Sequence, residues 1–331
     1  MAGRTRKIIS AVMAALMIMA AGGCGSSNKE IPSSADNSRY VSETKDNGNV
    51  TDGKEYDIDN GGLPYDEETV YNQLFDINNK VEIDVDISDD ELAKMQSDYN
   101  RYDNMGSKSP IYRKCDLKIS ITSDGVKNTY IIRNTGIRMK GNTSRTAFYD
   151  SNSGVYSLIH FKVDFTETFD DEQYYGGDSD YDLDIDKEKQ QNRTFATLDS
   201  MEIKWNQTSD STYVREYYAC EMYRDFGILA QRTNLASINL GDVHEGIFKI
   251  YEPVDKKFIK RYVAKEDCGG DLYKCGWTRN GATFLTNVSY GIEEKENRKF
   301  YNYDLKTNKK TSTHESFLTV SYTHLTLPTI A

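Results

Sequence analysis

A short glycine-containing stretch has the residue types needed to hold a phosphate group. Residues 136–145 read Gly-Ile-Arg-Met-Lys-Gly-Asn-Thr-Ser-Arg, so a small polar turn lies among three cations: Gly141, Asn142, Thr143 and Ser144 beside Arg138, Lys140 and Arg145. Backbone N–H groups together with cations are the donors that a phosphate requires. The stretch matches neither common glycine-rich nucleotide pattern, so a polar hairpin tip with solvated cations remains the alternative interpretation.

The second candidate is Lys162, which lies at the centre of the alternating segment 159–165. The apolar residues of this segment share one face of the predicted strand, and His160, Lys162 and Asp164 share the other. A lysine on a rigid strand can be directed at a bound phosphate, and a carboxylate on a helix can hold it there. Glu216 and Glu221 in the next predicted helix are the candidate partners. A surface cross-strand lysine is the alternative.

The third candidate is the segment 250–255, Ile-Tyr-Glu-Pro-Val-Asp, where a predicted strand passes into a predicted helix. Backbone groups at such a junction are free to pair with a planar ligand, and Glu252 or Asp255 could hold a sugar hydroxyl. Alternatively, Asp255 is the N-cap of the helix, or the segment is a simple turn at the end of a strand.

Two other patterns are interpreted as structural. Asp225-Phe226-Gly227 has the form of a kinase metal-binding tripeptide, but it ends a predicted helix, and Gly227 fits a C-cap. The acidic tract 178–186 resembles a calcium-binding loop but lacks the glycine and glutamate that an EF-hand requires. We expect this tract to be a solvated insertion loop.

Composition narrows the class of protein. The chain of 331 residues has 41 Lys and Arg against 52 Asp and Glu, a formal net charge of −11. This balance argues against nucleic-acid binding, which needs an excess of cations. The four histidines make a multi-histidine metal site improbable, whereas 37% apolar residues and 24 tyrosines suffice for a buried core.

The first 62 residues are expected to target and tether the protein. A basic start and an apolar run predict a signal peptide over residues 1–23, and the small residues before Cys24 resemble a bacterial lipoprotein box. Cys24 is therefore the predicted lipidation site of an extracytoplasmic lipoprotein anchored to the membrane at the bacterial surface. An ordinary signal peptide cut near Ala20 is the alternative. Residues 24–62 contain almost no large aliphatic side chains, which predicts a flexible tether.

The folded part is expected to begin at residue 63. Alternating segments at 81–87, 115–121 and 159–165 predict strands, and Ser88 is a predicted N-cap. A helix over 212–226 is followed by a predicted hairpin, 236–240 with 247–252, and by a helical segment at 254–263. The order indicates an α+β domain in which an antiparallel sheet packs against a helix.

Four cysteines remain beyond Cys24, an even number that permits disulfides outside the cytoplasm. Cys268 and Cys275 are the candidate pair because they are close in sequence. Two reduced, buried thiols are the alternative.

Several of these segments together resemble one family. The segments 136–145, 214–216 with 223–228, 246–258 and 270–274 occur in order and are similar to the spore-coat-protein-H (CotH) kinase family over about residues 80–318. The resemblance implies a divergent protein-kinase-like fold, mainly its N-terminal, nucleotide-facing lobe. It also implies ATP, a divalent metal (Mg²⁺ or Mn²⁺) and transfer of phosphate to Ser of a secreted or surface protein substrate.

The resemblance also assigns roles to the candidate residues. Lys162 would be the nucleotide-phosphate lysine and Glu216 its helix partner. The phosphate-facing loop would run from Gly141 to Arg145, and the adenine-facing hinge from Tyr251 to Val254, with Glu252 in it.

We find no counterpart of the family's C-terminal catalytic Asp residues. Residues 63–318 are therefore expected to be an incomplete kinase-like domain, inactive by truncation, and residues 319–331 an artefactual tail. The rival hypothesis is a surface lipoprotein without catalysis, which binds a protein or glycan through its many tyrosines.

Overall fold

The computed structural model describes residues 50–58, 65–105, 107–141, 146–150, 155–206, 210–241, 243–275, 277–278, 281–282 and 303–312. By its contacts the chain divides into residues 1–47 and 48–331, and every described residue belongs to the second unit. The predicted signal peptide, Cys24 and residues 319–331 lie outside the described residues. Among the described residues, no helix combines the length and apolar character needed to cross a bilayer.

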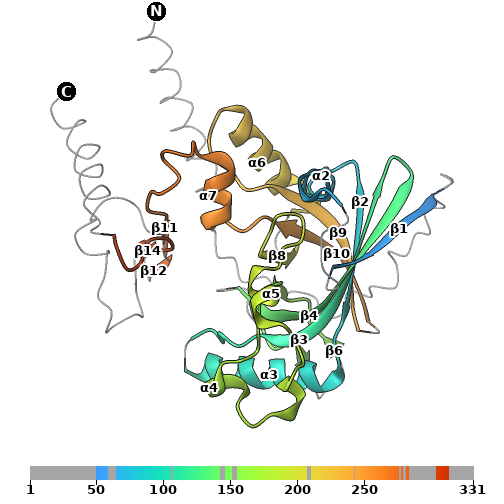
Figure 1. Cartoon of the computed structure of the whole chain (residues 1–331), viewed down its shortest axis with the longest axis vertical. Helices are drawn as coiled ribbons and strands as arrows, with labels where there is room; N and C mark the ends of the chain where they lie inside the picture. The colour runs from blue at the N-terminus through green and yellow to red at the C-terminus, as the bar shows by residue number, and fades with distance from the viewer. Residues whose placement is uncertain are drawn as a thin grey trace, which may run out of the picture. The chain divides into compact units, whose positions relative to one another are not determined.

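A curved sheet of eight strands is the main element of the structure (Figure 1). Its order is β1-β4-β3-β2-β9-β10-β8-β7, and β7 also pairs with β4, so that seven of the strands form a closed set of pairings. The strands are β1 (Thr51–Asp57), β2 (Lys80–Asp86), β3 (Arg113–Ser123), β4 (Val126–Lys140), β7 (His160–Asp164), β8 (Ser200–Trp205), β9 (Thr233–Leu240) and β10 (Val243–Tyr251).

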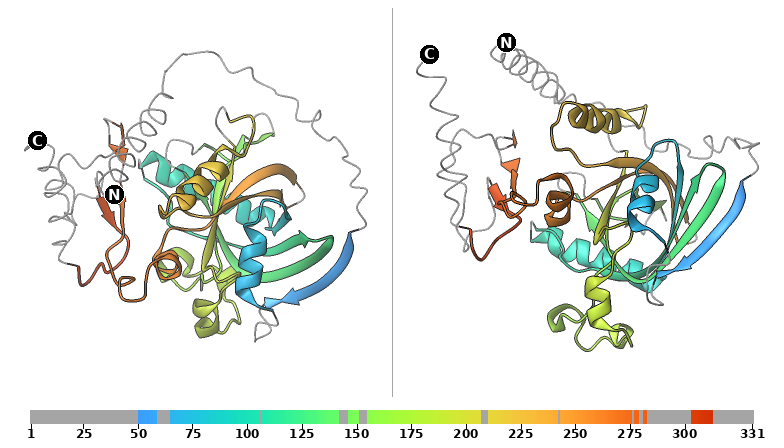
Figure 2. Two further views of the ribbon diagram at one scale, coloured as in Figure 1. Left: turned by 90° about the horizontal axis from the view of Figure 1, so that it is seen from above. Right: turned by 45° about the horizontal axis from the view of Figure 1, so that its top comes forward.

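Strand β1 corrects the predicted extent of the tether. It lies within the range 24–62, pairs in parallel with β4, and forms one margin of the sheet, drawn in blue in Figure 2. Most of its residues are exposed, and its sequence is polar. Backbone pairing with β4 therefore holds this strand, and such pairing leaves no hydrophobic pattern in the sequence.

The sheet is mixed, whereas the sequence predicted an antiparallel one. The pairs β1–β4 and β2–β9 are parallel, and the remaining pairs of the sheet are antiparallel. Strands β2 and β9 are far apart in the chain, and alternation along a strand does not specify the direction of its partner. The predicted combination of strands and helices is confirmed.

One face of the closed sheet carries the hydrophobic core. Ile83 of β2 lies opposite Ile119 of β3 and Ile238 of β9, and all three are fully buried. In the remaining strands, Ile203 of β8 lies opposite both Phe161 of β7 and Ile250 of β10 and belongs to the same core. Because side chains alternate along a strand, the residues between these positions face the opposite way.

The helices are α2 (Glu67–Leu74), α3 (Asp89–Asn104), α4 (Glu172–Tyr175), α5 (Lys187–Asn192), α6 (Arg215–Asp225) and α7 (Lys256–Tyr262). Ser88 caps α3 as predicted, because its Oγ accepts a hydrogen bond from the Glu91 N–H at 3.3 Å. Helix α3 is joined to β3 by Asp98 and Arg113, which form a buried two-point ion pair at 2.8 and 2.9 Å.

Short two-stranded ladders complete the described structure: β5 (Tyr149–Asp150) with β6 (Val155–Tyr156), β11 (Tyr273–Cys275) with β14 (Tyr303–Leu305), and β12 (Trp277–Thr278) with β13 (Gly281–Ala282).

Helix α6 differs from its predicted packing. The sequence places Val214, Tyr218, Met222 and Phe226 on one side, but no residue of α6 is buried, and Tyr218 and Phe226 are 64% and 67% exposed. The predicted C-cap is confirmed, since Gly227 has a positive φ of 74°.

Candidate functional site

A row of polar residues crosses four neighbouring strands on the face opposite the core. Arg138 of β4 lies opposite Lys162 of β7, Lys162 lies opposite Glu202 of β8, and Glu202 lies opposite Tyr251 of β10. Residues two positions away along these strands share the same face. Five cations therefore gather there, and we call them the cationic face: Arg138, Lys140, Lys162, Lys204 and Lys249.

Lys162 lies within this face rather than in bulk solvent. Its side chain is 23% exposed, and Nζ is 3.4 Å from Asp164 Oδ2. The ring of Tyr112 lies 5.8 Å from Lys162 Nζ and 5.0 Å from the Arg138 guanidinium, which brings the two cations together. Burial alone would lower the pKa of Lys162, but Tyr112 and Asp164 outweigh it and raise this pKa above its ordinary value. Lys162 is therefore charged at neutral pH.

The predicted pairing of Glu216 with Lys162 is wrong. In the described part of the chain, Glu216 instead accepts hydrogen bonds from Lys249 Nζ at 2.9 Å and from the Tyr251 hydroxyl. Burial opposes ionisation of Glu216, but Tyr251 and Lys249 outweigh it and lower its pKa. The reason is positional: α6 packs against β9 and its Glu216 contacts β10, whereas β7 lies two strands beyond β10 in the order β10-β8-β7.

Glu202 is the carboxylate at the centre of the cationic face. Its side chain is 19% exposed, forms an ion pair with Lys140, and lies 3.5 Å from Lys204 Nζ. Burial would raise the pKa of Glu202, but the two lysines outweigh burial and hold it below its ordinary value. The Lys204 ammonium also lies 3.9 Å from the centre of the Tyr251 ring. A single carboxylate therefore fixes cations from two strands.

The predicted phosphate-facing loop is described only at its start. Gly141 follows Lys140 at the end of β4 and has a φ of +127°, which side-chain-bearing residues rarely adopt. Asn142, Ser144 and Arg145 lie outside the described residues.

The predicted role of Glu252 in binding a sugar hydroxyl is wrong. Its side chain is fully buried and binds Arg261, the Tyr262 hydroxyl at 3.1 Å and the Arg232 N–H at 3.3 Å. Burial raises its pKa. The carboxylate is therefore used inside the protein to join α7 to β10.

Of the predicted hinge 251–254, only Val254 lies at the surface, because Tyr251, Glu252 and Pro253 are buried. Val254 is 44% exposed, and the Asp255 side chain accepts hydrogen bonds from the N–H groups of Lys257 and Phe258. The alternative interpretation of Asp255 as the N-cap of α7 is thus confirmed.

The predicted disulfide between Cys268 and Cys275 is not formed. Cys268 is a free thiol, and its Sγ donates to the Lys265 carbonyl at 3.1 Å. The backbone N–H of Cys268 is bonded to Ala264 O in the turn after α7, whereas Cys275 belongs to β11, which pairs with β14. The thiol of Cys268 is therefore directed into its own turn.

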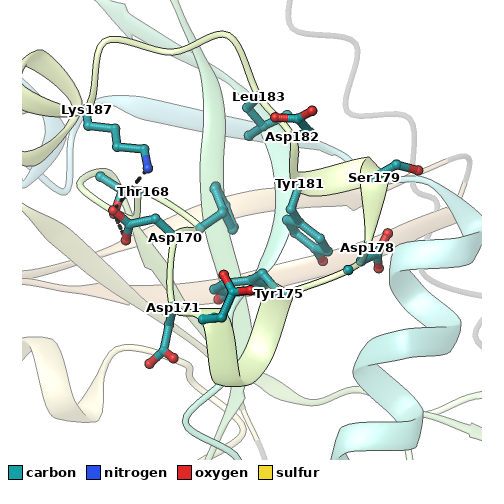
Figure 3. Close-up of a pocket in the computed structure, with 14 residues that line it drawn as sticks. Thr168, Asp170, Asp171, Tyr175, Asp178, Ser179, Tyr181, Asp182, Leu183 and Lys187 are labelled. Carbon is teal, nitrogen blue, oxygen red and sulfur yellow. Dashed lines mark hydrogen bonds and ion pairs between the residues drawn. The ribbon is translucent and has the colours of Figure 1, made fainter.

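Apart from the cationic face, a cavity lies in the segment between β7 and β8 (Figure 3). This cavity of about 540 Å³ is lined by residues from Thr168 to Lys187, and its rim carries Asp170, Asp171 and Asp182. Lys187 is its one lining cation among the described residues and lies 3.4 Å from Asp170. Because like charges repel, the cavity does not suit a polyphosphate.

The acidic tract 178–186 forms specific contacts and is not simply solvated. Asp178 and Asp180 each lie 2.9 Å from Lys94 Nζ. Asp90, Glu91 and Asp180 could hold a metal ion by spacing, but the Lys94 ammonium lies within 3.2 Å of each of them. The Lys94 ammonium therefore provides the positive charge that a metal ion would bring to these three carboxylates.

Alternation could have identified the partners that the sequence reasoning missed. Glu202 and Lys204 alternate with buried residues in β8, and Lys249 precedes Tyr251 by two in β10, so each pair shares a face. The position of Tyr112 between Arg138 and Lys162 has no such signal, because it depends on tertiary packing.

The cationic face fits the phosphates of a nucleotide better than it fits a metal ion. Among the described residues, the buried Nε of Arg138 has no hydrogen-bond partner, so a donor is left for an acceptor oxygen. The carboxylates Glu202 and Glu216 are each bound by lysine. Further ligands would be needed to hold a divalent cation here.

Part of the chain matches a known protein family. Residues 178–324 match the family model described as CotH kinase protein. The predicted resemblance to this family is confirmed over these residues, which include β8, α6 and β10 but not Arg138, Lys140 or Lys162. The matched range continues past residue 318, the predicted end of the kinase-like domain. None of the curated proteins compared with the chain matches it.

Proposed function

We propose that the cationic face binds the phosphates of ATP and that the chain is the nucleotide-facing part of a kinase-like protein. The observation that carries this proposal is the convergence of Arg138, Lys140, Lys162, Lys204 and Lys249 on one face of four strands. The chain as a whole is acidic, with a net charge of −11, so this local excess of cations does not follow from the overall composition. Charge-assisted hydrogen bonds from such groups are the usual means of holding phosphate.

The geometry supports distinct roles for its residues. Lys162 and Arg138 form the end of the face next to β3 and Tyr112, and Gly141 lets the chain turn beside Lys140. The exposed junction at Val254, between β10 and α7, is the candidate contact for the adenine ring. Glu216 contributes indirectly, because it fixes Lys249 and Tyr251.

The match to the CotH kinase family supports the chemistry proposed for the whole protein. This chemistry is transfer of the ATP γ-phosphate to Ser of a secreted or surface protein, with a divalent metal that neutralises phosphate charge when bound. Anchoring through a lipid on Cys24 would place the protein on the bacterial surface, where such substrates occur. The lysines of the cationic face would orient the phosphates and exclude water from them.

Transfer of radiolabel tests this function. The full-length protein, which would also carry the family's catalytic Asp residues, is incubated with γ-labelled ATP, Mg²⁺ or Mn²⁺ and a secreted-protein fraction, beside Lys162→Ala and the control Lys118→Ala. Lys118 lies on β3, outside the cationic face, and is exposed. Labelling of serine that is lost in Lys162→Ala and retained in Lys118→Ala supports the proposal. Equal labelling by Lys162→Ala would refute the role given to Lys162.

A second function, binding without catalysis, is favoured by the exposed aromatic residues around α6. Tyr213, Tyr218, Tyr223 and Phe226 are between 37% and 67% exposed. Exposed aromatic side chains are frequent at protein-binding surfaces. This alternative predicts no affinity for ATP, whereas the kinase-like function requires it.

A further inference from the structure

The carboxylate of Glu202 connects two lysines that are not sequence neighbours. Lys140 is the last residue of β4, and Lys204 is on β8. Strand β7 lies between β4 and β8, and its Lys162 is the register partner of Glu202. Glu202 binds Lys140 and lies 3.5 Å from Lys204, and all three side chains are 19% to 30% exposed. They are therefore half-buried but can be reached from outside.

We propose that Glu202 is a positioning residue that holds Lys140 and Lys204 toward a polyphosphate, and that the protonation of Lys140 sets the alkaline limit of polyphosphate binding. The inference rests on the proposed function, because it concerns the same cationic face. It assigns to Glu202 the task of orienting phosphate-binding lysines that the sequence had assigned to Glu216.

The surroundings of Lys140 make its charge sensitive to pH. Glu202 and Lys204 face it from β8, Lys274 from β11, and His160 is its register partner on β7. Burial lowers the pKa of Lys140 to about 8; Glu202 opposes this change, and Lys204 and Lys274 add to it. Lys140 is thus mostly charged at pH 7 and mostly neutral above pH 9.

This arrangement has a direct consequence for an anionic ligand. A bound phosphate stabilises the ammonium form of Lys140, so binding at alkaline pH must be accompanied by proton uptake. Affinity should therefore decrease as the pH rises through about 8. Loss of Glu202 removes the carboxylate that favours the charged form, so the decrease should move to lower pH.

The test is calorimetric titration of the full chain with inorganic tripolyphosphate and with ATP, from about pH 6.5 to about pH 9.5. The proteins are the wild type, Lys140→Arg, Glu202→Gln and the control Lys118→Arg. For the wild type and the control, affinity for polyphosphate should fall about tenfold across this range, because one hydrogen bond from a charged donor to the phosphate is lost. Lys140→Arg, which stays charged, should bind with little pH dependence. Glu202→Gln should show the same fall at lower pH.

A second measurement needs no ligand. The rate of acetylation of Lys140, followed by mass spectrometry against pH, reports its pKa directly. The midpoint of this pH profile should lie near 8 in the wild type and at a lower pH in Glu202→Gln. A merely structural ion pair would also move the acetylation profile of Lys140 in Glu202→Gln, but it would leave the pH profile of polyphosphate binding unchanged.

The outcomes separate this inference from the proposed function. Binding that does not depend on pH in the wild type, or a pH dependence that persists in Lys140→Arg, overturns the inference while the nucleotide site stands. An absence of ATP and tripolyphosphate binding at every pH overturns both. Tripolyphosphate binding as tight as ATP binding, together with a fall at lower pH in Glu202→Gln, supports the role of Glu202 and shows that the face binds the phosphates rather than the nucleoside.

Discussion

Glu216 of α6 is bound to Lys249 of β10 at 2.9 Å, and the two side chains are very differently exposed. Lys249 is 7% exposed and Glu216 is 54% exposed. The Tyr251 hydroxyl donates to the same carboxylate, and Asp210 lies 3.8 Å from Lys249. The contact therefore joins a helix without buried residues to the polar face of the sheet.

This asymmetry predicts unequal effects of removing either partner. In Glu216→Ala, the buried Lys249 loses its closest acceptor, and the free energy of unfolding should fall by about 1–3 kcal/mol. In Lys249→Met the half-exposed Glu216 can be solvated, so the loss should be smaller. Urea denaturation measures both, with Glu221→Ala as the control on the same helix. A larger loss for Lys249→Met than for Glu216→Ala would contradict the relationship.

Gly141 should be required for its conformation rather than for its size. With a φ of +127°, Gly141→Ala should lower the free energy of unfolding by about 1–3 kcal/mol through backbone strain. Gly269→Ala is the matched control, because a Cβ at that position meets nothing within 4 Å and its φ is not positive. If both variants unfold at the same urea concentration as the wild type, the backbone at Gly141 is not constrained as described.

Lys140 should make stability depend on pH in a particular direction. Its pKa is about 8 in the folded protein against an ordinary value of 10.5, so between these values the unfolded chain binds more protons. Stability then rises with pH across this window, by up to about 3 kcal/mol. Lys140→Met lacks the contribution, so the wild type should gain stability relative to this variant as the pH rises from 8 to 10.5.

Urea midpoints for the two proteins at both ends of this range measure the gain. Tyrosines that titrate at alkaline pH are common to both proteins, so their contributions cancel in the difference in stability. A difference that stays constant, or that changes in the opposite direction, would show that the Lys140 pKa is not lowered.

Local patterns predicted many of the individual elements. Alternation predicted β2, β3 and β7 to within a few residues, because one face of each of these strands lies in the core. Asp124 and Gly125, a residue pair typical of hairpin turns and both with positive φ, join β3 and β4. Strand β1 and the closure of β7 on β4 were not predictable, because backbone pairing between distant segments has no sequence signature.

The candidate site was only partly predictable for a similar reason. Arg138 and Lys162 were identified from their strands, and register places them opposite each other. The choice between Lys162 and Lys249 as the partner of Glu216 depended on which strand α6 approaches, which the sequence does not state. Glu252 was misassigned because the Arg261 and Tyr262 groups that surround it come from the next helix.

Calorimetric titration of the full chain with ATP at neutral pH, for the wild type, Lys162→Ala and Lys118→Ala, tests the central claim most directly. The cationic face predicts ATP binding by the wild type, unchanged affinity in Lys118→Ala, and at least about tenfold weaker binding in Lys162→Ala, since a charged hydrogen bond to phosphate is lost. Equal affinities of the wild type and Lys162→Ala, or no binding by the wild type, would contradict the claim that these strands form a phosphate site.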